Sequence, residues 1–521
     1  MAKSKIFPFN FDAGTKRDNT QFDGNFYSDS KWCRWYRKKP KKIGGYQSVY
    51  NGFANIVRGE PMMFSKSNYS YVYGGSTSQL EMVVLDSSGG GGAYYDRTPA
   101  GMPVSVNNEW KTTAIYNSGG IGMVGVAMVT QTLSDISDAT NNKLWYGDIV
   151  GAAAFTQLGS ITVSGGVVAI PPYMFAYGND GYLAWSDKNN VALMGAGAGG
   201  DAGDARICAN KVVKGIPIRG GSSNSPAGLF WSLDTLQRIS YVGGTLIFRN
   251  DTIASNISIL STNAVVDYDG IVEWPGVDRF LSYNGVVQEV ENNTHLDWFY
   301  NNYNRAYPQK IFAFANQRYG EIWYCFPYGT ATECTHALVH NRRENTWYDT
   351  ELPEGGRSAG LPAISTFQNP LMFGTEASSA NKYRLWMHES GVDKVVDGST
   401  LAIQSYFETP NIAFIDEGPM NDGGWMGANN WVRVIRMEPD FLQTGNLTIT
   451  LKGSKFAMAP QDNAQSYTYD GTTSFKIDSR KQYREMTIKF ESNVQGGDYY
   501  MGKCMIELAP GDARATSGST V

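Results

Sequence analysis

Apolar and polar residues follow one another in short runs along most of the chain. Between about residues 50 and 395, runs of four to eight apolar or aromatic residues are separated by Gly, Asn and Asp. This pattern is typical of strands joined by tight turns, because strand side chains alternate between two faces and these residues accept turn geometry. Helical spacing is nearly absent. The sequence therefore predicts an all-β protein.

Several of these runs predict β-hairpins. In residues 173–187, the runs YMFAYG and YLAWSD flank Asn179-Asp180-Gly181, which is a strong turn signal. Similar turns are expected at Gly243-Gly244, Asp269-Gly270 and Asn284-Gly285. The hairpins recur at roughly 40 to 50 residues, the spacing of the four-stranded blades of β-propellers. We therefore expect a β-propeller-like domain over residues 51–400, with a blade count that the degenerate repeat does not reveal.

The pattern changes beyond residue 400, where longer alternating strands begin. Leu447, Ile449 and Leu451 alternate with threonines and a lysine, which predicts one buried and one solvated face. This pattern predicts a separate C-terminal β-sandwich or barrel domain over residues 401–514. The small polar residues 515–521 are expected to form a flexible tail.

The first 50 residues begin polar and turn-rich and then become basic and aromatic. We interpret residues 1–50 as an extended N-terminal arm that ends in a docking segment. Cationic side chains attract phosphates or acidic protein surfaces, and Trp and Tyr stack or pack. We favour docking to a neighbouring subunit over a plain surface strand or direct DNA contact. The docking residues are Lys31, Trp32, Arg34, Trp35, Arg37, Lys38 and Lys39.

Composition narrows the function classes. The 58 Gly, 31 Tyr, 24 Phe and 13 Trp residues suit many short strands and turns. A formal charge of −5 argues against tight wrapping of nucleic acid. The five scattered cysteines predict reduced thiols and assembly in a reducing cytoplasm. No apolar run is long enough to predict a signal peptide or a transmembrane segment.

Two motifs are candidate sites of chemistry. The Gly-rich residues 195–204 lack the Lys-Ser or Lys-Thr of a phosphate loop and the repeats of a calcium roll, so an ordinary loop is predicted. Zinc is suggested by Cys325, Cys334, His336 and His340, yet a straight strand would hold the two histidines about 13 Å apart. We therefore predict no cofactor and no metal.

Nothing in the sequence forms a recognisable catalytic device. Only four histidines are available as bases, and none lies beside a Gly-x-Ser-x-Gly elbow. Asp267 and Asp269 fit turn chemistry better than the acid and nucleophile of a glycosidase. We predict that the chain is not an enzyme, with a polysaccharide-degrading tailspike as the weaker alternative.

Long motifs of unusual composition resemble a family of structural proteins of short-tailed bacteriophages. The first is RDNTQFDGNFYSDSKWCRWYRKKPKKIGGY at residues 17–46, and others follow over nearly the whole chain. They include residues 211–244, residues 267–285, GEIWYCFP from Gly320, ECTHALVHNRRENTWYDT from Glu333 and GGDYYMGKCMIELAPGD from Gly496.

The resemblance implies a tail nozzle or tail hub, built as a homo-oligomer in the form of a hexameric ring. The expected partners are a head-to-tail adaptor protein, tail fibres or a tail needle or plug, and phage DNA that passes through the channel without tight binding. The implied location is the virion tail, after assembly in the host bacterial cytoplasm. A receptor- or glycan-binding tail appendage is the alternative function.

Overall fold

The computed structural model describes residues 4–18, 25–120, 122–130, 143–218, 225–413, 430–454 and 459–513. Strands dominate these residues, and the one α-helix among them is α1 (Leu296–Asn302). The all-β prediction is confirmed. The predicted tail, residues 515–521, lies outside the described residues. In the described part of the chain, no helix is long and apolar enough to cross a membrane.

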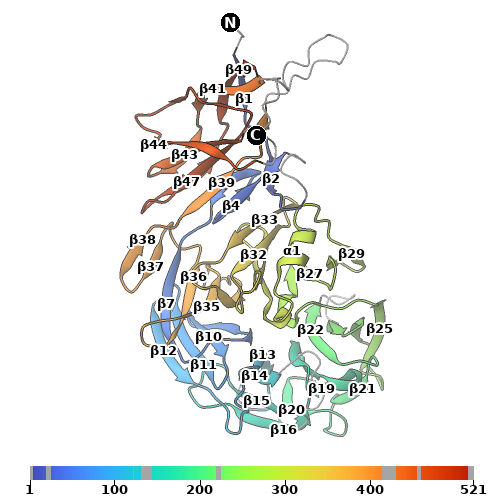
Figure 1. Cartoon of the computed structure of the whole chain (residues 1–521). Coiled ribbons are helices and arrows are strands. Elements are labelled where there is room, and N and C mark those ends of the chain that lie inside the picture. The colour runs from blue at the N-terminus through green and yellow to red at the C-terminus, as the bar shows by residue number, and fades with distance from the viewer. Residues whose placement is uncertain are drawn as a thin grey trace.

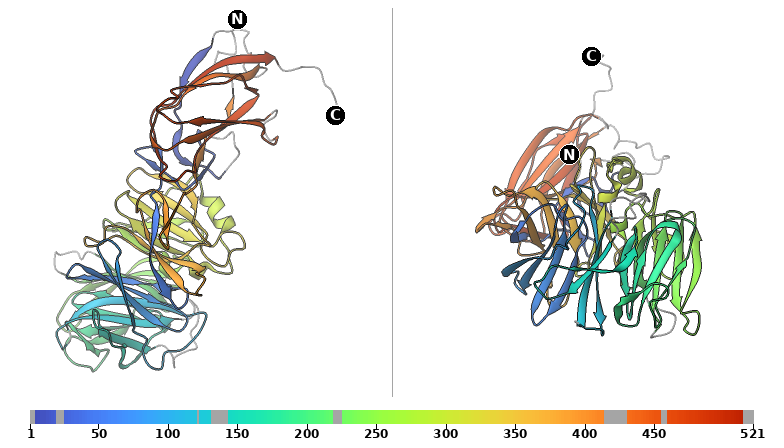
Figure 2. Two further views of the ribbon diagram at one scale, coloured as in Figure 1. Left: turned by 90° about the vertical axis from the view of Figure 1, so that its left-hand side faces the viewer. Right: turned by 90° about the horizontal axis from the view of Figure 1, so that it is seen from below.

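The molecule has a large lower part and a smaller upper part (Figure 1). Seven sheets with mostly antiparallel pairing build the lower part, and they follow one another along the chain except that the seventh also takes a strand from residues 46–53. The upper part contains strands from both ends of the chain, and strand β1 (Lys5–Pro8) pairs there with β49 (Met505–Ala513). Figure 2 shows from below how the sheets of residues 62–255 stand side by side.

The first three sheets comprise residues 59–206. The first contains β9 (Met62–Lys66), β10 (Tyr69–Gly75), β11 (Leu80–Asp86) and β12 (Gly91–Asp96). The second contains β8 (Gly59–Glu60), β13 (Glu109–Asn117), β14 (Gly122–Thr130), β15 (Lys143–Asp148) and β16 (Thr156–Thr162). The third contains β17 (Gly166–Ile170), β18 (Tyr173–Tyr177), β19 (Tyr182–Asp187), β20 (Asn190–Met194) and β21 (Gly203–Arg206), with the 3₁₀ helix η1 (Asn179–Gly181).

The next three sheets comprise residues 212–351. The fourth contains β22 (Val212–Ile218), β23 (Ala227–Ser232), β24 (Thr235–Tyr241) and β25 (Phe248–Ser255). The fifth contains β26 (Val266–Tyr268), β27 (Ile271–Pro275), β28 (Phe280–Tyr283) and β29 (Val287–Glu289). The sixth contains β30 (Phe312–Asn316), β31 (Glu321–Phe326), β32 (His336–Asn341) and β33 (Thr346–Glu351); η2 (Thr262–Ala264) and η3 (Pro308–Lys310) are short 3₁₀ helices.

The seventh sheet combines strands that are far apart in the sequence. It contains β34 (Arg357–Leu361), β35 (Leu371–Ala377), β36 (Tyr383–His388), β7 (Tyr46–Phe53), β37 (Lys394–Val396) and β38 (Ser399–Leu401). Strand β7 pairs antiparallel with β36, so that Ser48 lies opposite Trp386. A strand from the start of the chain thus completes the last of the seven sheets.

Neighbouring sheets share hydrophobic clusters, and the order of packing returns to its start. Each cluster joins side chains of two consecutive sheets, the cluster between the sixth and seventh sheets also extends into the upper part, and one cluster joins the seventh sheet to the first. Representative pairs are Tyr73 and Trp110, Val124 and Met174, Phe175 and Phe230, Trp231 and Trp274, Phe280 and Tyr324, Trp323 and Trp386, and Phe373 and Val83. Burial of these apolar surfaces on both faces of each sheet is the main force that holds the lower part together.

The predicted hairpins form where local turn chemistry favours them. Strands β18 and β19 pair with Phe175 opposite Trp185, and Asp180 at the turn has a φ of 53°. Asp269 and Gly270 also adopt positive φ values, which an Asp-Gly pair tolerates at low cost.

Three sheets and one short strand pair make up the upper part. The first sheet contains β1 (Lys5–Pro8), β49 (Met505–Ala513), β41 (Asn430–Glu438), β45 (Ile477–Asp478) and β46 (Gln482–Tyr483). The second contains β4 (Asp29–Lys31), β39 (Ser405–Glu408), β40 (Ile412–Ala413), β47 (Glu485–Ser492), β43 (Leu447–Ser454) and β44 (Asp462–Tyr469). The third contains β42 (Phe441–Thr444), β48 (Asp498–Met501), β6 (Lys39–Lys42) and β5 (Cys33–Tyr36), and β2 (Asp12–Thr15) pairs with β3 (Phe26–Tyr27).

Residues 1–50, predicted as an extended arm, are built into the sheets of the upper part and, through β7, into the seventh sheet, where the structure describes them. Strand β1 pairs with β49, β4 pairs with β39, and β6 pairs with β48. Pairing with C-terminal strands satisfies backbone N–H and C=O groups that a free arm would leave to solvent. The upper part therefore depends on both ends of the chain.

Candidate functional site

The basic-aromatic segment lies where the upper part meets the sixth and seventh sheets. Trp32, Arg34 and Trp35, three of the residues predicted for docking to a partner, are 3%, 0% and 0% exposed. Trp35 packs against Tyr348, with ring centroids 5.4 Å apart. Trp32 packs against Trp323 at 6.2 Å. These three side chains therefore dock onto another part of the same chain.

Arg34 is the charged centre of this junction. Its Nε lies 3.0 Å from Glu321 Oε1, and its Nη1 donates to Glu389 Oε2 at 3.1 Å. Burial alone would lower the pKa of Arg34, but the two carboxylates raise this pKa well above its ordinary value. The arginine remains charged and ties β5 to the lower part.

The other predicted docking residues are more accessible. Lys31 Nζ lies 2.5 Å from Glu351 Oε2, and the two side chains are 33% and 51% exposed. Arg37 and Lys38 form the exposed turn between β5 and β6, with φ values of 51° and 60°. Lys39 is half-buried at the start of β6. Docking of these four residues to a partner stays a prediction.

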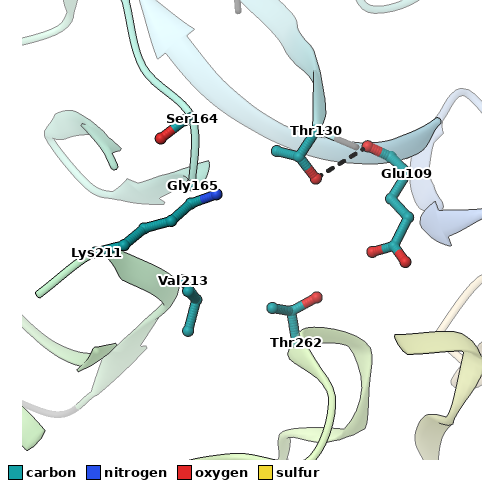
Figure 3. A pocket seen from close by; sticks show the side chains of 7 residues that line it. All are labelled: Glu109, Thr130, Ser164, Gly165, Lys211, Val213 and Thr262. Atoms are coloured by element: carbon teal, nitrogen blue, oxygen red, sulfur yellow. Dashed lines mark hydrogen bonds between the residues drawn. The ribbon is translucent and has the colours of Figure 1, made fainter. Parts of the chain in front are cut away.

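A second candidate site is a small polar cavity of about 10 Å³ in the lower part (Figure 3). It is lined by Glu109, Thr130, Ser164, Gly165, Lys211, Val213 and Thr262. These residues come from the second sheet, from the beginnings of the third and fourth sheets, and from η2. The volume has room for about one water molecule and is too small for an organic substrate.

A network of ion pairs lies beside this cavity. Glu60 Oε1 accepts from Lys111 Nζ at 2.9 Å and from Lys214 Nζ at 2.8 Å. Lys111 also donates to Thr262 Oγ1 at 2.6 Å. Burial raises the pKa of Glu60, but the two lysines outweigh burial and hold it below its ordinary value. This network connects the second sheet to the fourth sheet and to η2.

The cysteine and histidine side chains considered as zinc ligands contact other groups in the fold. Cys334 Sγ donates to the Lys310 carbonyl at 3.1 Å. His336 stacks on Tyr328 with centroids 4.2 Å apart, and His340 Nδ1 lies 2.7 Å from Glu273 Oε1. No group of three or more His, Cys, Asp and Glu residues in the described ranges could hold a metal ion.

The Gly-rich residues 195–204 form a loop that leads into β21, and neighbouring residues hold it in place. The backbone N–H of Asp201 donates to Asp187 Oδ1 at 2.9 Å, and Asp201 Oδ2 lies 2.9 Å from Lys188 Nζ. Asp201 Oδ2 also accepts from the Tyr173 hydroxyl at 2.7 Å. These contacts fix the position of the loop on the third sheet.

A buried Thr-His-Asp cluster was not found by sequence reasoning. Thr15 Oγ1 and Asp349 Oδ1 lie 3.0 Å and 3.2 Å from the same atom, His295 Nε2. A nucleophile and an orienting acid should instead meet opposite nitrogens of the imidazole. All three side chains are buried, with 0%, 0% and 3% of the residue surface of Thr15, His295 and Asp349 exposed. The cluster therefore joins β2, α1 and β33 and does not face a substrate.

Comparison with known proteins gives little further guidance. No family model and no curated protein matches the chain. Among solved structures, the chain is similar to a "putative exported protein" of Bacteroides fragilis NCTC 9343, at 8% identity and a TM-score of 0.31. The similarity covers 67% of this chain and 94% of that chain. It is too low to indicate a shared function.

Proposed function

We propose that the seven sheets of the lower part are the blades of a seven-bladed β-propeller. Two observations support this proposal: the hydrophobic clusters follow the sheets in cyclic order, and β7 completes the last sheet with a strand from the start of the chain. Radial repetition of four-stranded sheets is the plan of propellers. The three sheets of the upper part are proposed to form a β-sandwich.

We further propose that the chain is a structural component of a short bacteriophage tail, as a nozzle or hub. The long motifs that resemble short-tailed phage proteins are the sequence support. The observation that carries the proposal is the single hydrophobic cluster that runs from the upper part into the sixth and seventh sheets, with Phe407, Trp35 and Trp386 among its members. Such a continuous core makes the chain a stiff block, which suits a wall through which a genome is ejected.

In this proposal the chain acts by shape and contact and catalyses no reaction. Copies assemble into a hexameric ring that joins a head-to-tail adaptor protein and carries tail fibres or a tail needle or plug. Subunit rings of this kind use heterologous interfaces that close by rotation. Phage DNA passes through the ring without tight binding, and the location is the virion tail.

Electron microscopy of the purified full-length chain tests the assembly. We expect closed rings with sixfold symmetry and a central opening. Mass photometry of the same sample should give a species near six times the chain mass of 57.3 kDa. Monomers or trimeric fibres at the concentrations found in infected cells would overturn the ring.

Immunogold labelling of virions tests the location. An affinity tag at the C-terminus should place gold at the tail, and a tag on the major capsid protein should place gold on the head as the matched control. Binding of the purified chain to a glycan array, together with tail-tip labelling outside a ring, would instead support a receptor-binding appendage.

A further inference from the structure

Cations from three separate segments gather on one surface beside the junction. They lie in the β5–β6 hairpin, in the β30–β31 turn and in the β32–β33 turn. The set, named here the basic-tyrosine surface, comprises Arg37, Lys38, Lys39, Lys41, Arg318 and Arg343 with Tyr36 and Tyr319. Arg37, Lys38, Arg318 and Arg343 are exposed, and Lys39 and Lys41 are half-buried.

Specific contacts hold the three segments together. The rings of Tyr36 and Tyr319 meet edge to face with centroids 5.8 Å apart. Arg343 Nη2 donates to the Gln317 carbonyl at 2.7 Å, which joins the two turns of the sixth sheet. Glu344 accepts from the backbone N–H groups of Arg37 and Lys38, each at 2.8 Å. The cations therefore share one rigid platform.

The six cations lack acidic partners. Among the residues that the structure describes, none of the six forms an ion pair, whereas Lys31, Arg34 and Lys394 near the junction do. The nearby carboxylate, Glu344, is occupied by two backbone N–H groups. A cluster of like charges without counter-charges repels itself, and an external polyanion relieves that repulsion. This concentration of positive charge is unusual on a chain of formal charge −5.

The tyrosine rings point to phosphates as the ligand and not to unstacked bases. Arg34 lies 3.6 Å from the Tyr319 centroid, and Arg318 lies 5.3 Å from it. Arg37 and Lys41 lie 5.2 Å and 5.5 Å from the Tyr36 centroid. Because the chain's own cations already cover these rings, base stacking is not open to them. The rings instead hold the cations in position.

We propose that the basic-tyrosine surface binds the sugar-phosphate backbone of duplex DNA without sequence preference. A protein partner is less suited, since lysine is depleted from the cores of protein interfaces and aromatic or apolar anchors are needed there. Non-specific phosphate binding is weak at physiological salt and lets a protein slide along DNA. The inference stands on this surface alone and does not require the chain to be a tail protein.

Fluorescence anisotropy with a labelled duplex of about 25 base pairs tests the proposal. The full-length chain should bind at about 50 mM salt, with a slope of log affinity against log salt between about −2 and −5, because six cations release at most about five counterions. The triple variant Arg37→Ala, Lys38→Ala and Arg318→Ala should bind at least about tenfold more weakly and flatten the slope by about 2 to 3.

A matched control removes three exposed cations elsewhere. The variant Arg206→Ala, Arg249→Ala and Lys382→Ala changes the net charge equally and lies in the lower part away from the junction. We expect it to keep the affinity within about twofold. Thermal unfolding of both variants verifies their folds, and the single variant Arg318→Ala provides a milder substitution with the same expected direction.

Three outcomes would overturn the proposal. The unmodified chain could fail to bind duplex DNA at about 100 µM, well above the range of non-specific affinities. Both triple variants could lose affinity equally, which would assign binding to the overall charge. Finally, the Arg37, Lys38 and Arg318 variant could keep DNA affinity but lose self-association in light scattering, which would identify the surface as a contact between copies of the chain.

Discussion

Arg34 and Glu321 form a buried ion pair that joins strands from different parts of the molecule. The Nε to Oε1 distance is 3.0 Å, and the two side chains are 1% and 0% exposed. Arg34 belongs to β5 of the upper part, and Glu321 begins β31 of the sixth sheet. Taking two charges out of water is costly unless both remain paired, so this contact makes the junction sensitive to loss of either partner.

Substitution Arg34→Ala should lower the free energy of unfolding by about 3 to 5 kcal/mol, because it leaves Glu321 and Glu389 buried without their cation. Urea unfolding at neutral pH measures the change. The matched control is Arg37→Ala in the same segment, where the side chain is exposed and the expected change is within about 0.5 kcal/mol. Equal effects at both positions would contradict the role given to Arg34.

The hairpins of the lower part were predictable because their signals are local. Asn179-Asp180-Gly181 lies between the two strands that it connects, and the backbone angles of the turn depend on those residues alone. The same holds for the alternation of Leu447, Ile449 and Leu451, all buried on one face of β43. Strand and turn content thus follows from neighbouring residues.

The burial of the basic-aromatic segment within the same chain could not be predicted from local signals. Arg34 meets Glu389, which is 355 positions away in the sequence, and no local pattern identifies that acid as its partner. A single sequence shows that cations and tryptophans are close together, but it does not show whether their partners lie in the same chain. The pairing of β7 with β36 escapes prediction for the same reason.

Acid should weaken the contact between Arg17 and Asp349. Arg17 Nε and Nη2 donate to the two Asp349 oxygens, each at 2.9 Å. Burial favours the neutral acid, but Arg17 and His295 hold the pKa of Asp349 well below its ordinary value. Because the pKa is depressed, the stabilisation is present above the unfolded-state pKa of about 3.9 and is lost as pH falls below it.

Substitution Asp349→Asn should therefore cost about 2 to 4 kcal/mol at pH 7, and the difference from the unmodified chain should shrink at about pH 3. Urea unfolding at the two pH values tests this expectation. Asp29→Asn is the control, because Asp29 also pairs with Arg17 but its side chain is 37% exposed. A cost that is the same at both pH values would contradict the ionic origin of the stabilisation.

Glu81 is a buried carboxyl group that, among the described residues, has no cation in hydrogen-bonding range. It accepts from the Ala54 backbone N–H at 3.1 Å and from the Tyr94 hydroxyl at 3.2 Å. Burial raises the pKa of Glu81 to about 7. The folded chain therefore binds a proton more tightly than the unfolded chain, and stability falls as pH rises from about 4.5 to 7.

Substitution Glu81→Gln keeps an acceptor but removes the charge. We expect it to increase the free energy of unfolding at pH 8 by up to roughly 3 kcal/mol and to have a much smaller effect at pH 5. Thermal unfolding at both pH values measures the difference. A Glu60→Gln control should show the opposite sign at pH 8, because Lys111 and Lys214 stabilise that carboxylate.

The cysteines should differ in their reactivity. Cys33, Cys325, Cys334 and Cys504 are buried and Cys208 is half-buried. Burial raises the pKa of Cys33 and of Cys504 to about 12, which suppresses the reactive thiolate. Ellman's reagent should therefore modify Cys208 first in the native chain and all five thiols in denaturant. The control is Cys208→Ser, in which the rapid reaction with the reagent should disappear. Rapid reaction of a second thiol in the native chain would contradict the burial of the other four cysteines.

The packing of the seventh sheet against the first sheet should depend on Phe53. This residue at the end of β7 is 0% exposed, and its ring lies 5.3 Å from that of Phe373. Both rings share a cluster with Val72 and Val83 of the first sheet. Phe53→Ala should lower the free energy of unfolding by about 3 to 5 kcal/mol, because the cavity would open where the cyclic packing closes.

Urea unfolding and limited proteolysis check this prediction together. Proteolysis should accelerate at the loop that follows β7, because loss of the ring frees both the end of β7 and its neighbour β36. Phe475→Ala is the matched control, since this ring is 72% exposed and should change stability by less than about 0.5 kcal/mol. If Phe53→Ala behaves like Phe475→Ala, the last and first sheets are not held together by this cluster, and a closed ring of sheets loses its main support.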